Sequence, residues 1–162
     1  TDTNLNALVK EYANLAFHGM RAGKNAINVD LEFNLDENII NVPLISEDFS
    51  RVIVNLCNNA FDAMRDKLNS ATKDYRAKLT VSTKVIDGKI ILEIKDNGPG
   101  IPEEIKDKIM QPFFTTKKGT EGTGLGLSIT NDIIKMHAGE LIISSKKDEG
   151  TSFSIQLTVN NR

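Results

Sequence analysis

The chain has 162 residues, of which 40% are hydrophobic and 26% charged, an ordinary balance for one globular domain with a real core. Its formal net charge of −2 gives no general affinity for nucleic acid or acidic membranes, and no apolar run approaches the ~20 residues that cross a bilayer. The single cysteine, Cys57, excludes a disulfide framework within the chain and is expected to be a buried, inert thiol.

The sequence opens Thr-Asp-Thr, with neither an initiator methionine nor a visible signal peptide. We therefore expect a processed chain or a piece of a longer protein, whose other parts could hold membrane segments.

In the first part of the chain, apolar residues at helical spacing predict an amphipathic helix over residues 4–20, ended by Gly19 and Gly23. Residues 27–35 alternate as a strand, and residues 41–45 form a second, short strand.

The middle of the chain holds the longest helical pattern. Ser46 is predicted to be its N-cap, and the helix continues to about Leu68. Two strands follow, over residues 79–86 and 89–96, and the Asp87-Gly88 pair between them is the strongest short hairpin signal.

The last third begins with a turn and a short helix that Pro102 opens, followed by a polar loop. Residues 125–137 predict a helix closed by Gly139. Strands over residues 141–146 and 151–159 form a final hairpin.

The final strand indicates the architecture, because apolar and polar residues alternate along it and give the sheet one covered and one wet face. Helices on one side of a mixed, mostly antiparallel sheet make a two-layer α/β sandwich, and this is the predicted fold class.

Three polar residues of the long helix, Asn55, Asn59 and Asp62, fall together on the border of its apolar face. A carboxamide oxygen is a reasonable ligand for magnesium, which prefers oxygen. The alternative is the solvated edge of an ordinary helix.

Asp96 ends its strand on the same face as the apolar residues, so it is predicted to point toward the helices. A carboxylate there needs hydrogen-bond donors, and an adenine amino group is a good one. Gly98 and Gly100 would let the turn pass close to a flat base, although turn chemistry alone also explains these glycines.

Two further segments suit phosphates. Phe113 and Phe114 could anchor a mobile loop whose Lys117 or Lys118 reaches phosphate oxygens, unless this is only a solvated loop with an apolar anchor. Glycines then precede an apolar helix, as in a lid over phosphates. These lid glycines are Gly119, Gly122, Gly124 and Gly126.

The order of these segments resembles the catalytic ATP-binding domain of sensor histidine kinases, with its N, G1, F and G2 boxes, over about Asn28 to Val159. The matching stretches are Asn55-Leu56-x-x-Asn59-Ala60, Asp96-Asn97-Gly98-Pro99-Gly100-Ile101, Phe113-Phe114 and Gly122-Thr123-Gly124-Leu125-Gly126-Leu127. The wider superfamily includes DNA gyrase and the mismatch-repair ATPases and shares the Bergerat fold.

This resemblance implies ATP and Mg²⁺ as cofactors. It makes Asn59 the magnesium ligand and Asp96 the adenine-reading carboxylate, and it gives Asn55, Asn59 and Lys117 catalytic roles. The other nucleotide contacts that it implies are Asp62, Gly98, Gly100, Ile101, Phe114, Thr116, Gly122, Thr123, Gly124, Leu125, Gly126 and Leu127.

Asn55 stands where hydrolytic relatives place a glutamate that activates water. An amide cannot take a proton at neutral pH, so transfer to a protein acceptor is favoured over hydrolysis. Neither His18 nor His137 matches the acceptor motif of the family, and both are expected to be structural or surface residues.

The resemblance therefore implies an acceptor histidine on a separate dimerisation domain, and a response regulator downstream. Residues 1–22 would be the helix leading from the dimerisation domain, and residues 23–162 the ATP-binding domain. We expect a cytoplasmic location for this domain, with no nucleic-acid or direct membrane contact. The alternatives are a hydrolytic ATPase or serine kinase of the same superfamily, or a nucleotide-sensing module without catalysis.

Overall fold

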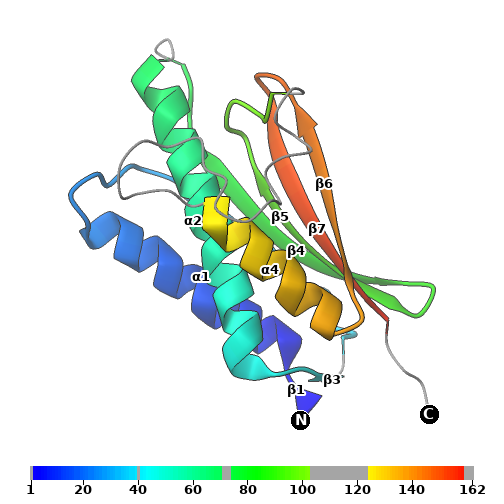
Figure 1. Ribbon diagram of the computed structural model, residues 1–162. Helices are drawn as coiled ribbons and strands as arrows, with labels where there is room; N and C mark the ends of the chain where they lie inside the picture. Colours follow the sequence, from blue (N-terminus) through cyan, green and yellow to red (C-terminus); the bar gives the residue numbers. More distant parts are fainter. Residues whose placement is uncertain (1, 40, 71–73, 103–123, 159–162) are drawn as a thin grey trace.

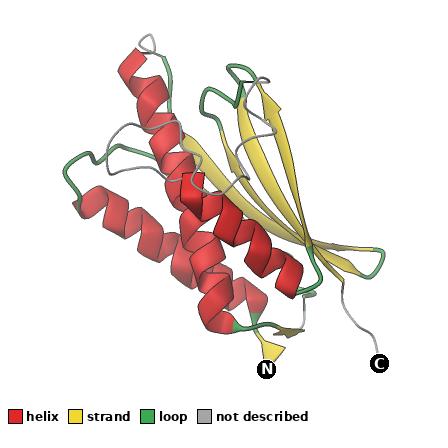
Figure 2. Ribbon diagram, viewed as in Figure 1, coloured by secondary structure: helices red, strands yellow, loops and turns green. Residues whose placement is uncertain are grey.

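The computed structural model describes residues 2–39, 41–70, 74–102 and 124–158. In these ranges three helices lie over one face of a five-stranded sheet, and a small two-stranded sheet lies near the N-terminus (Figure 1). The two layers are separate in Figure 2, with helices red and strands yellow. The predicted two-layer sandwich is confirmed.

Apart from β1, which was not predicted, the described elements follow one another along the chain as the sequence predicted, with ends that differ by up to about three residues. They are β1 (Asp2–Thr3), α1 (Leu5–Ala22), β2 (Asp30–Asn34), β3 (Val42–Pro43), α2 (Ser46–Ser70), β4 (Lys78–Ile86), β5 (Lys89–Asp96), α4 (Gly124–Met136), β6 (Glu140–Lys146) and β7 (Gly150–Thr158). The short helix expected after Pro102 lies outside the described residues.

The large sheet has the strand order β2-β4-β5-β7-β6. Only β2 and β4 are parallel, while β4–β5, β5–β7 and β7–β6 are antiparallel. The β4–β5 hairpin turns at Asp87 and Gly88, which both have positive φ angles (53° and 77°), as a two-residue hairpin turn requires. The hairpin predicted from this dipeptide is confirmed.

The core lies between the helices and one face of the sheet, where alternate residues of β4, β5 and β7 are buried. On the other face of β7, Ser152, Ser154 and Gln156 are half-buried, so the wet face is also confirmed. Cys57 is fully buried on α2, and burial raises the pKa of its thiol to about 12, which keeps it protonated.

Helix α1 packs beside α2, and its apolar stripe belongs to the same buried cluster as the rest of the domain. The buried residues of this stripe are Leu5, Leu8, Val9, Ala13 and Ala16. That α1 leads from a dimerisation domain, with the ATP-binding part starting at residue 23, stays a prediction. His18 is exposed on this helix.

The predicted end of α1 at Gly19 was wrong, because the helix continues through Gly19 to Ala22. A glycine inside a helix costs about 1 kcal/mol relative to alanine, which a packed apolar face can outweigh. Gly23 does end the helix, and its N–H donates to the carbonyl of Met20.

Ser46 was predicted to be the N-cap of α2, but it is already the first helical residue. The N-cap position belongs to Ile45, whose carbonyl accepts from the Phe49 N–H (2.9 Å). The Ile45 N–H, in turn, donates to Nε2 of His137 (3.0 Å), so a side chain 92 residues away satisfies the helix start.

His137 is therefore structural, and it links the end of α4 to the start of α2. Its Nε2 accepts a hydrogen bond, so the proton lies on Nδ1, which donates to the Ile133 carbonyl (2.8 Å). Its ring also packs edge-on against Phe49 at 5.6 Å.

Helix α4 ends at Met136, three residues before Gly139, the residue expected to close it. Ala138 takes the left-handed conformation (φ 58°) and donates to Lys135, while the Gly139 N–H donates to Ile134. Together these bonds form a Schellman motif with alanine where glycine is usual. The reason for glycine at position 139 is close packing, because a Cβ there would lie 2.8 Å from the Gln156 carbonyl oxygen.

Of the helices that the structure describes, none combines the length and the apolar composition of a membrane span.

Candidate functional site

The first part of the site is the carboxylate of Asp96, at the end of β5. It is 3% exposed and lies on the covered face of the sheet, as predicted. Burial raises the pKa of this carboxyl to about 6, although the backbone amides of Gly98 and Thr151 and the charge of Lys67 act in the opposite direction. Asp96 is thus a mostly ionised acceptor at neutral pH, held in an apolar layer.

The turn after Asp96 lies very close to its neighbours, which explains its glycines. The Gly98 N–H donates to Oδ1 of Asp96 (2.8 Å), and a Cβ at Gly98 would lie 2.9 Å from that same oxygen. Gly100 has a φ of +82°, and a Cβ there would lie 2.5 Å from the Lys146 carbonyl oxygen. Larger residues at either position would push the turn away from the sheet or the hairpin.

Asn97 fastens the turn to the start of β4. Its Oδ1 accepts from the Lys78 N–H (2.9 Å) and the Tyr75 hydroxyl (3.1 Å), and its Nδ2 donates to the Arg76 carbonyl (2.7 Å). A side chain with all three of these bonds leaves little freedom to the backbone on either side.

The β6–β7 hairpin holds the other side of the turn. The Asp148 N–H donates to the Pro99 carbonyl (2.8 Å), and the Ile101 N–H donates to Oγ of Ser145 (2.6 Å). The predicted contact residue Ile101 is thus anchored on β6 and packs against the core.

Helix α2 forms one wall beside this turn, since a Cβ at Gly98 would lie 3.4 Å from that of Ala63. Asn59 is one helical turn before Ala63 and Asn55 is one turn before Asn59, and both are half-buried. Nδ2 of Asn59 is fully buried and has no hydrogen-bond partner among the described residues. Its carboxamide therefore has bonding capacity left for a group that the domain binds.

Asp62 lies elsewhere on α2. It pairs with Arg65 (2.7 Å) and lines a groove of about 520 Å³ between α1 and α2, so the structure does not bring it to the Asp96 turn. Its predicted contact with a nucleotide stays a prediction.

These residues fit a magnesium ion only if the nucleotide supplies most of its ligands. In the described ranges no three His, Cys, Asp or Glu side chains gather where they could hold a metal. Magnesium is commonly bound by one or two protein oxygens together with phosphates and water, and the carboxamide of Asn59 can supply such an oxygen.

Helix α4 forms the second wall. It packs beside α2 and begins at Gly124, so the backbone of Gly124, Leu125 and Gly126 forms its first turn, with amide groups that favour a phosphate (Figure 1). Leu127 is buried and fixes this turn to the core. The predicted residues Phe113, Phe114, Thr116, Lys117, Lys118, Gly119, Gly122 and Thr123 lie outside the described residues.

Sequence reasoning missed the residues that hold the turn, namely Lys67, Tyr75, Asn97 as a side chain, and Ser145. The sequence indicated Asn97 only as part of a turn motif. No local pattern predicted the roles of the other three, because their partners are distant in the sequence.

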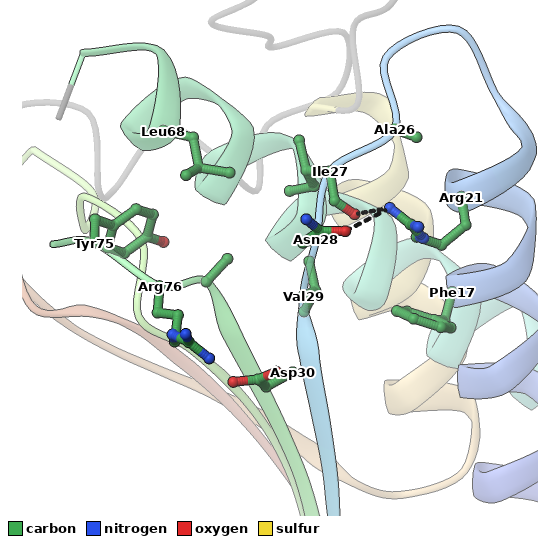
Figure 3. Close-up of a pocket in the computed structure, with 11 residues that line it drawn as sticks. Phe17, Arg21, Ala26, Ile27, Asn28, Val29, Asp30, Leu68, Tyr75 and Arg76 are labelled. Carbon is green, nitrogen blue, oxygen red and sulfur yellow. Dashed lines mark hydrogen bonds between the residues drawn. The ribbon is translucent and has the colours of Figure 1, made fainter. Parts of the chain in front are cut away.

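A separate cavity of about 870 Å³ lies where the C-terminal ends of α1 and α2 approach the starts of β2 and β4 (Figure 3). Figure 3 shows Arg21 turned toward the loop before β2, where it donates to the Ile27 carbonyl (3.0 Å) and Oδ1 of Asn28 (2.9 Å). Tyr75 borders this cavity, but none of the predicted nucleotide-binding residues that the structure describes does so.

Comparisons with known proteins identify the family of this domain. Residues 45–161 match the family described as histidine kinase-, DNA gyrase B- and HSP90-like ATPase. Sporulation kinase D of Bacillus subtilis is 34% identical over 137 residues, which cover 84% of this chain and 25% of that protein. The histidine-protein kinase AtoS of Escherichia coli is 34% identical over 158 residues, which cover 97% of this chain and 24% of that protein.

Among solved structures, the nucleotide-free catalytic domain of the histidine kinase ThkA matches with a TM-score of 0.77 and 31% identity, covering 99% of this chain and 98% of that one. ThkA in complex with the response regulator TrrA matches with a TM-score of 0.75 and 29% identity, covering 99% of this chain and 42% of that one. The chain spans about a quarter of the curated relatives named above. It belongs to the histidine kinase-, DNA gyrase B- and HSP90-like ATPase family, as an ATP-binding catalytic domain of the histidine-kinase type.

Proposed function

We propose that the domain binds ATP with the adenine against Asp96 and the phosphates at the start of α4, and that it donates the γ-phosphate to a histidine on a separate domain. The observation that carries this proposal is the buried carboxylate of Asp96, which faces the helices beside a turn too tight for side chains at Gly98 and Gly100.

Asp96 suits adenine more than guanine. With a pKa of about 6, its carboxyl is mostly ionised at pH 7 and accepts a hydrogen bond from the adenine amino group. Guanine has a carbonyl oxygen at that position, which the carboxylate would repel. Buried polar groups left without partners discriminate strongly between such ligands.

The chemistry of α2 favours transfer over hydrolysis. Asn55 presents a carboxamide, which cannot accept a proton from water at neutral pH. The next carboxylate along the helix, Asp62, lines the groove between α1 and α2 and is paired with Arg65. Water therefore finds no evident base on this stripe, and the attacking base would be the imidazole of the acceptor histidine.

Asn59 is the side chain that would hold magnesium, through its carboxamide oxygen. Its unpartnered Nδ2 is a donor and would instead be free to bind an oxygen of the nucleotide. When bound with ATP, magnesium supplies positive charge that offsets the charge of the phosphates. The residues of the domain then orient the nucleotide: Asp96 fixes the base, and the first turn of α4 fixes the phosphate chain. Lys117, beyond the described residues, would add charge near the γ-phosphate.

The partners lie outside the chain. Because the related kinases are about four times longer, a histidine-bearing dimerisation domain has room elsewhere in the parent protein. The solved complex of ThkA with its response regulator supports a regulator of that kind as the next phosphate acceptor. A requirement for ATP supports a cytoplasmic location.

The test combines binding, hydrolysis and transfer. The domain should bind Mg-ATP and ADP by calorimetry, release no phosphate steadily, and transfer label from γ-labelled ATP to a histidine-bearing helical domain. The label should be lost in acid, as a phosphohistidine is, and a helical domain with that histidine replaced by alanine serves as the control.

Other outcomes would identify the alternatives. Steady phosphate release that disappears in Asn55→Ala would favour a hydrolytic ATPase. An acid-stable label would indicate a serine kinase, and binding with neither activity would indicate a nucleotide-sensing module.

A further inference from the structure

We propose that Lys67 is a positioning residue for base recognition: it fixes the peptide group that aims the Asp96 carboxylate. This inference rests on the proposed function, in which Asp96 reads the adenine. Lys67 belongs to the last turn of α2, about two helical turns beyond Asn59.

The ammonium group of Lys67 reaches across to backbone carbonyls of two separate segments. Its Nζ lies 2.9 Å from the Asp148 oxygen, 3.3 Å from the Asn97 oxygen and 3.5 Å from the Gly98 oxygen. An ammonium group has three donors, so these three carbonyls can use all of them. The side chain thus bridges the Asp96 turn and the β6–β7 hairpin.

Tyr75 holds the same ammonium group from another side. Nζ of Lys67 lies 4.7 Å from the centre of the Tyr75 ring, within the range of a cation–π contact. The hydroxyl of Tyr75 donates to Asn97 (3.1 Å), so the ring is fixed to the same turn. A long, mobile side chain is thereby kept in one place.

The link from Lys67 to Asp96 runs through one planar group. The Asn97 carbonyl and the Gly98 N–H belong to the same peptide unit and point in opposite directions. Lys67 binds the carbonyl, and the N–H donates to Oδ1 of Asp96 at 2.8 Å. Because the unit is planar, holding the Asn97 carbonyl also fixes the direction of the Gly98 N–H. That N–H holds Oδ1 of Asp96, and so the orientation of the whole carboxylate is fixed.

The hairpin strengthens this arrangement. The backbone of Asp148 makes two hydrogen bonds: its carbonyl accepts from Nζ of Lys67, and its N–H donates to the Pro99 carbonyl (2.8 Å). The hairpin is thus bonded both to the lysine and to the turn. The positive charge of Lys67 also lowers the pKa of Asp96, which favours the ionised acceptor. Position and charge thus act in the same direction on base recognition.

The test compares Lys67→Met, which keeps the length but removes charge and donors, with Lys67→Arg, which keeps both. Lys10→Met, at an exposed lysine of α1, is the matched control. Affinities for ADP and GDP are measured by calorimetry at pH 7.5, and thermal melting shows that each variant is folded at the assay temperature.

We expect Lys67→Met to bind ADP roughly tenfold more weakly, as for the loss of a charge-assisted contact, and to lose much of its preference for ADP over GDP. Lys67→Arg should recover part of both, and Lys10→Met should match the original chain. Should Lys67→Met fail to fold, Lys67→Gln, which removes the charge but keeps two donors on a slightly shorter side chain, is judged by the same criteria.

Two results would overturn the inference. One is a folded Lys67→Met with the original ADP affinity and base preference. The other is an equal loss for ADP and GDP, unrelieved by arginine, which would mean a general weakening of the fold. An original chain that binds no nucleotide would instead refute the proposed function itself.

Discussion

Replacing Asp96 by asparagine is expected to stabilise the nucleotide-free domain at pH 7 while it weakens ATP binding. Burial raises the pKa of Asp96 from 3.8 to about 6, so the folded state holds this proton more tightly than the unfolded state. Between about pH 4 and 6 the folded domain therefore binds more protons, and this group's contribution to the free energy of unfolding falls as pH rises. Above pH 6 that loss is complete.

The size of the effect follows from the difference between the two pKa values, about 6 minus 3.8, or about two units. At 1.36 kcal/mol for each unit, ionised Asp96 costs the fold up to about 3 kcal/mol at pH 7. Asparagine carries no charge, and its Oδ1 can still accept from the Gly98 N–H. Asp96→Asn should thus be more stable by up to about 3 kcal/mol at pH 7, and close to the original chain near pH 4.

Urea unfolding of both proteins between pH 4 and 7.5 measures this directly, because the other titrating groups cancel in the difference. ATP affinity should fall by about 1–3 kcal/mol, since the amide presents a competing donor to the adenine amino group. A stability difference that stays constant with pH, or a variant less stable at pH 7, would refute the account of Asp96.

Two further predictions concern other parts of the domain. Ala138→Gly should stabilise it by about 1 kcal/mol, since alanine at φ 58° is strained and glycine is not, and an unchanged or lower melting temperature would contradict this. Asn59→Ala should have a free energy of unfolding within about 1 kcal/mol of the original chain, but its ATP affinity should no longer depend on magnesium. If the variant keeps this magnesium dependence, Asn59 is not a ligand of the metal.

The large features of the fold were predictable because they depend on local patterns. The Asp87-Gly88 turn sets its hairpin with two residues, and strict alternation along β7 separates the buried face from the wet one. The inward direction of Asp96 followed from the same alternation along β5.

The wrong helix ends had non-local causes. Nothing near Ser46 in the sequence shows that His137 accepts from the Ile45 N–H and so satisfies one backbone donor at the start of the helix. Nothing near Gly19 shows that the packing of α1 on α2 outweighs the cost of one glycine.

The residues of the candidate site also fall into those that a local motif predicts and those that only distant contacts reveal. Asn59, Asp96, Gly98 and Gly100 could be predicted as site residues because each belongs to a compact motif, and their roles stay predictions. Lys67 escaped notice because its contacts lie in a turn 30 residues away and in a hairpin 81 residues away. Its role becomes visible only when strand order brings those segments together.

The position of β5 in the middle of the sheet also bears on how the domain is made. β5 can pair with β4 as soon as both leave the ribosome, because two residues join them, and such hairpins form in about 1–10 μs. Its other partner, β7, is separated from it by residues 97–149, and Asp96 pairs with Thr151 at the far end of that ladder. The surroundings of Asp96 therefore cannot be completed during synthesis until β7 has emerged and docked. If Asp96 reads the base as proposed, a nascent chain should acquire nucleotide affinity late and abruptly.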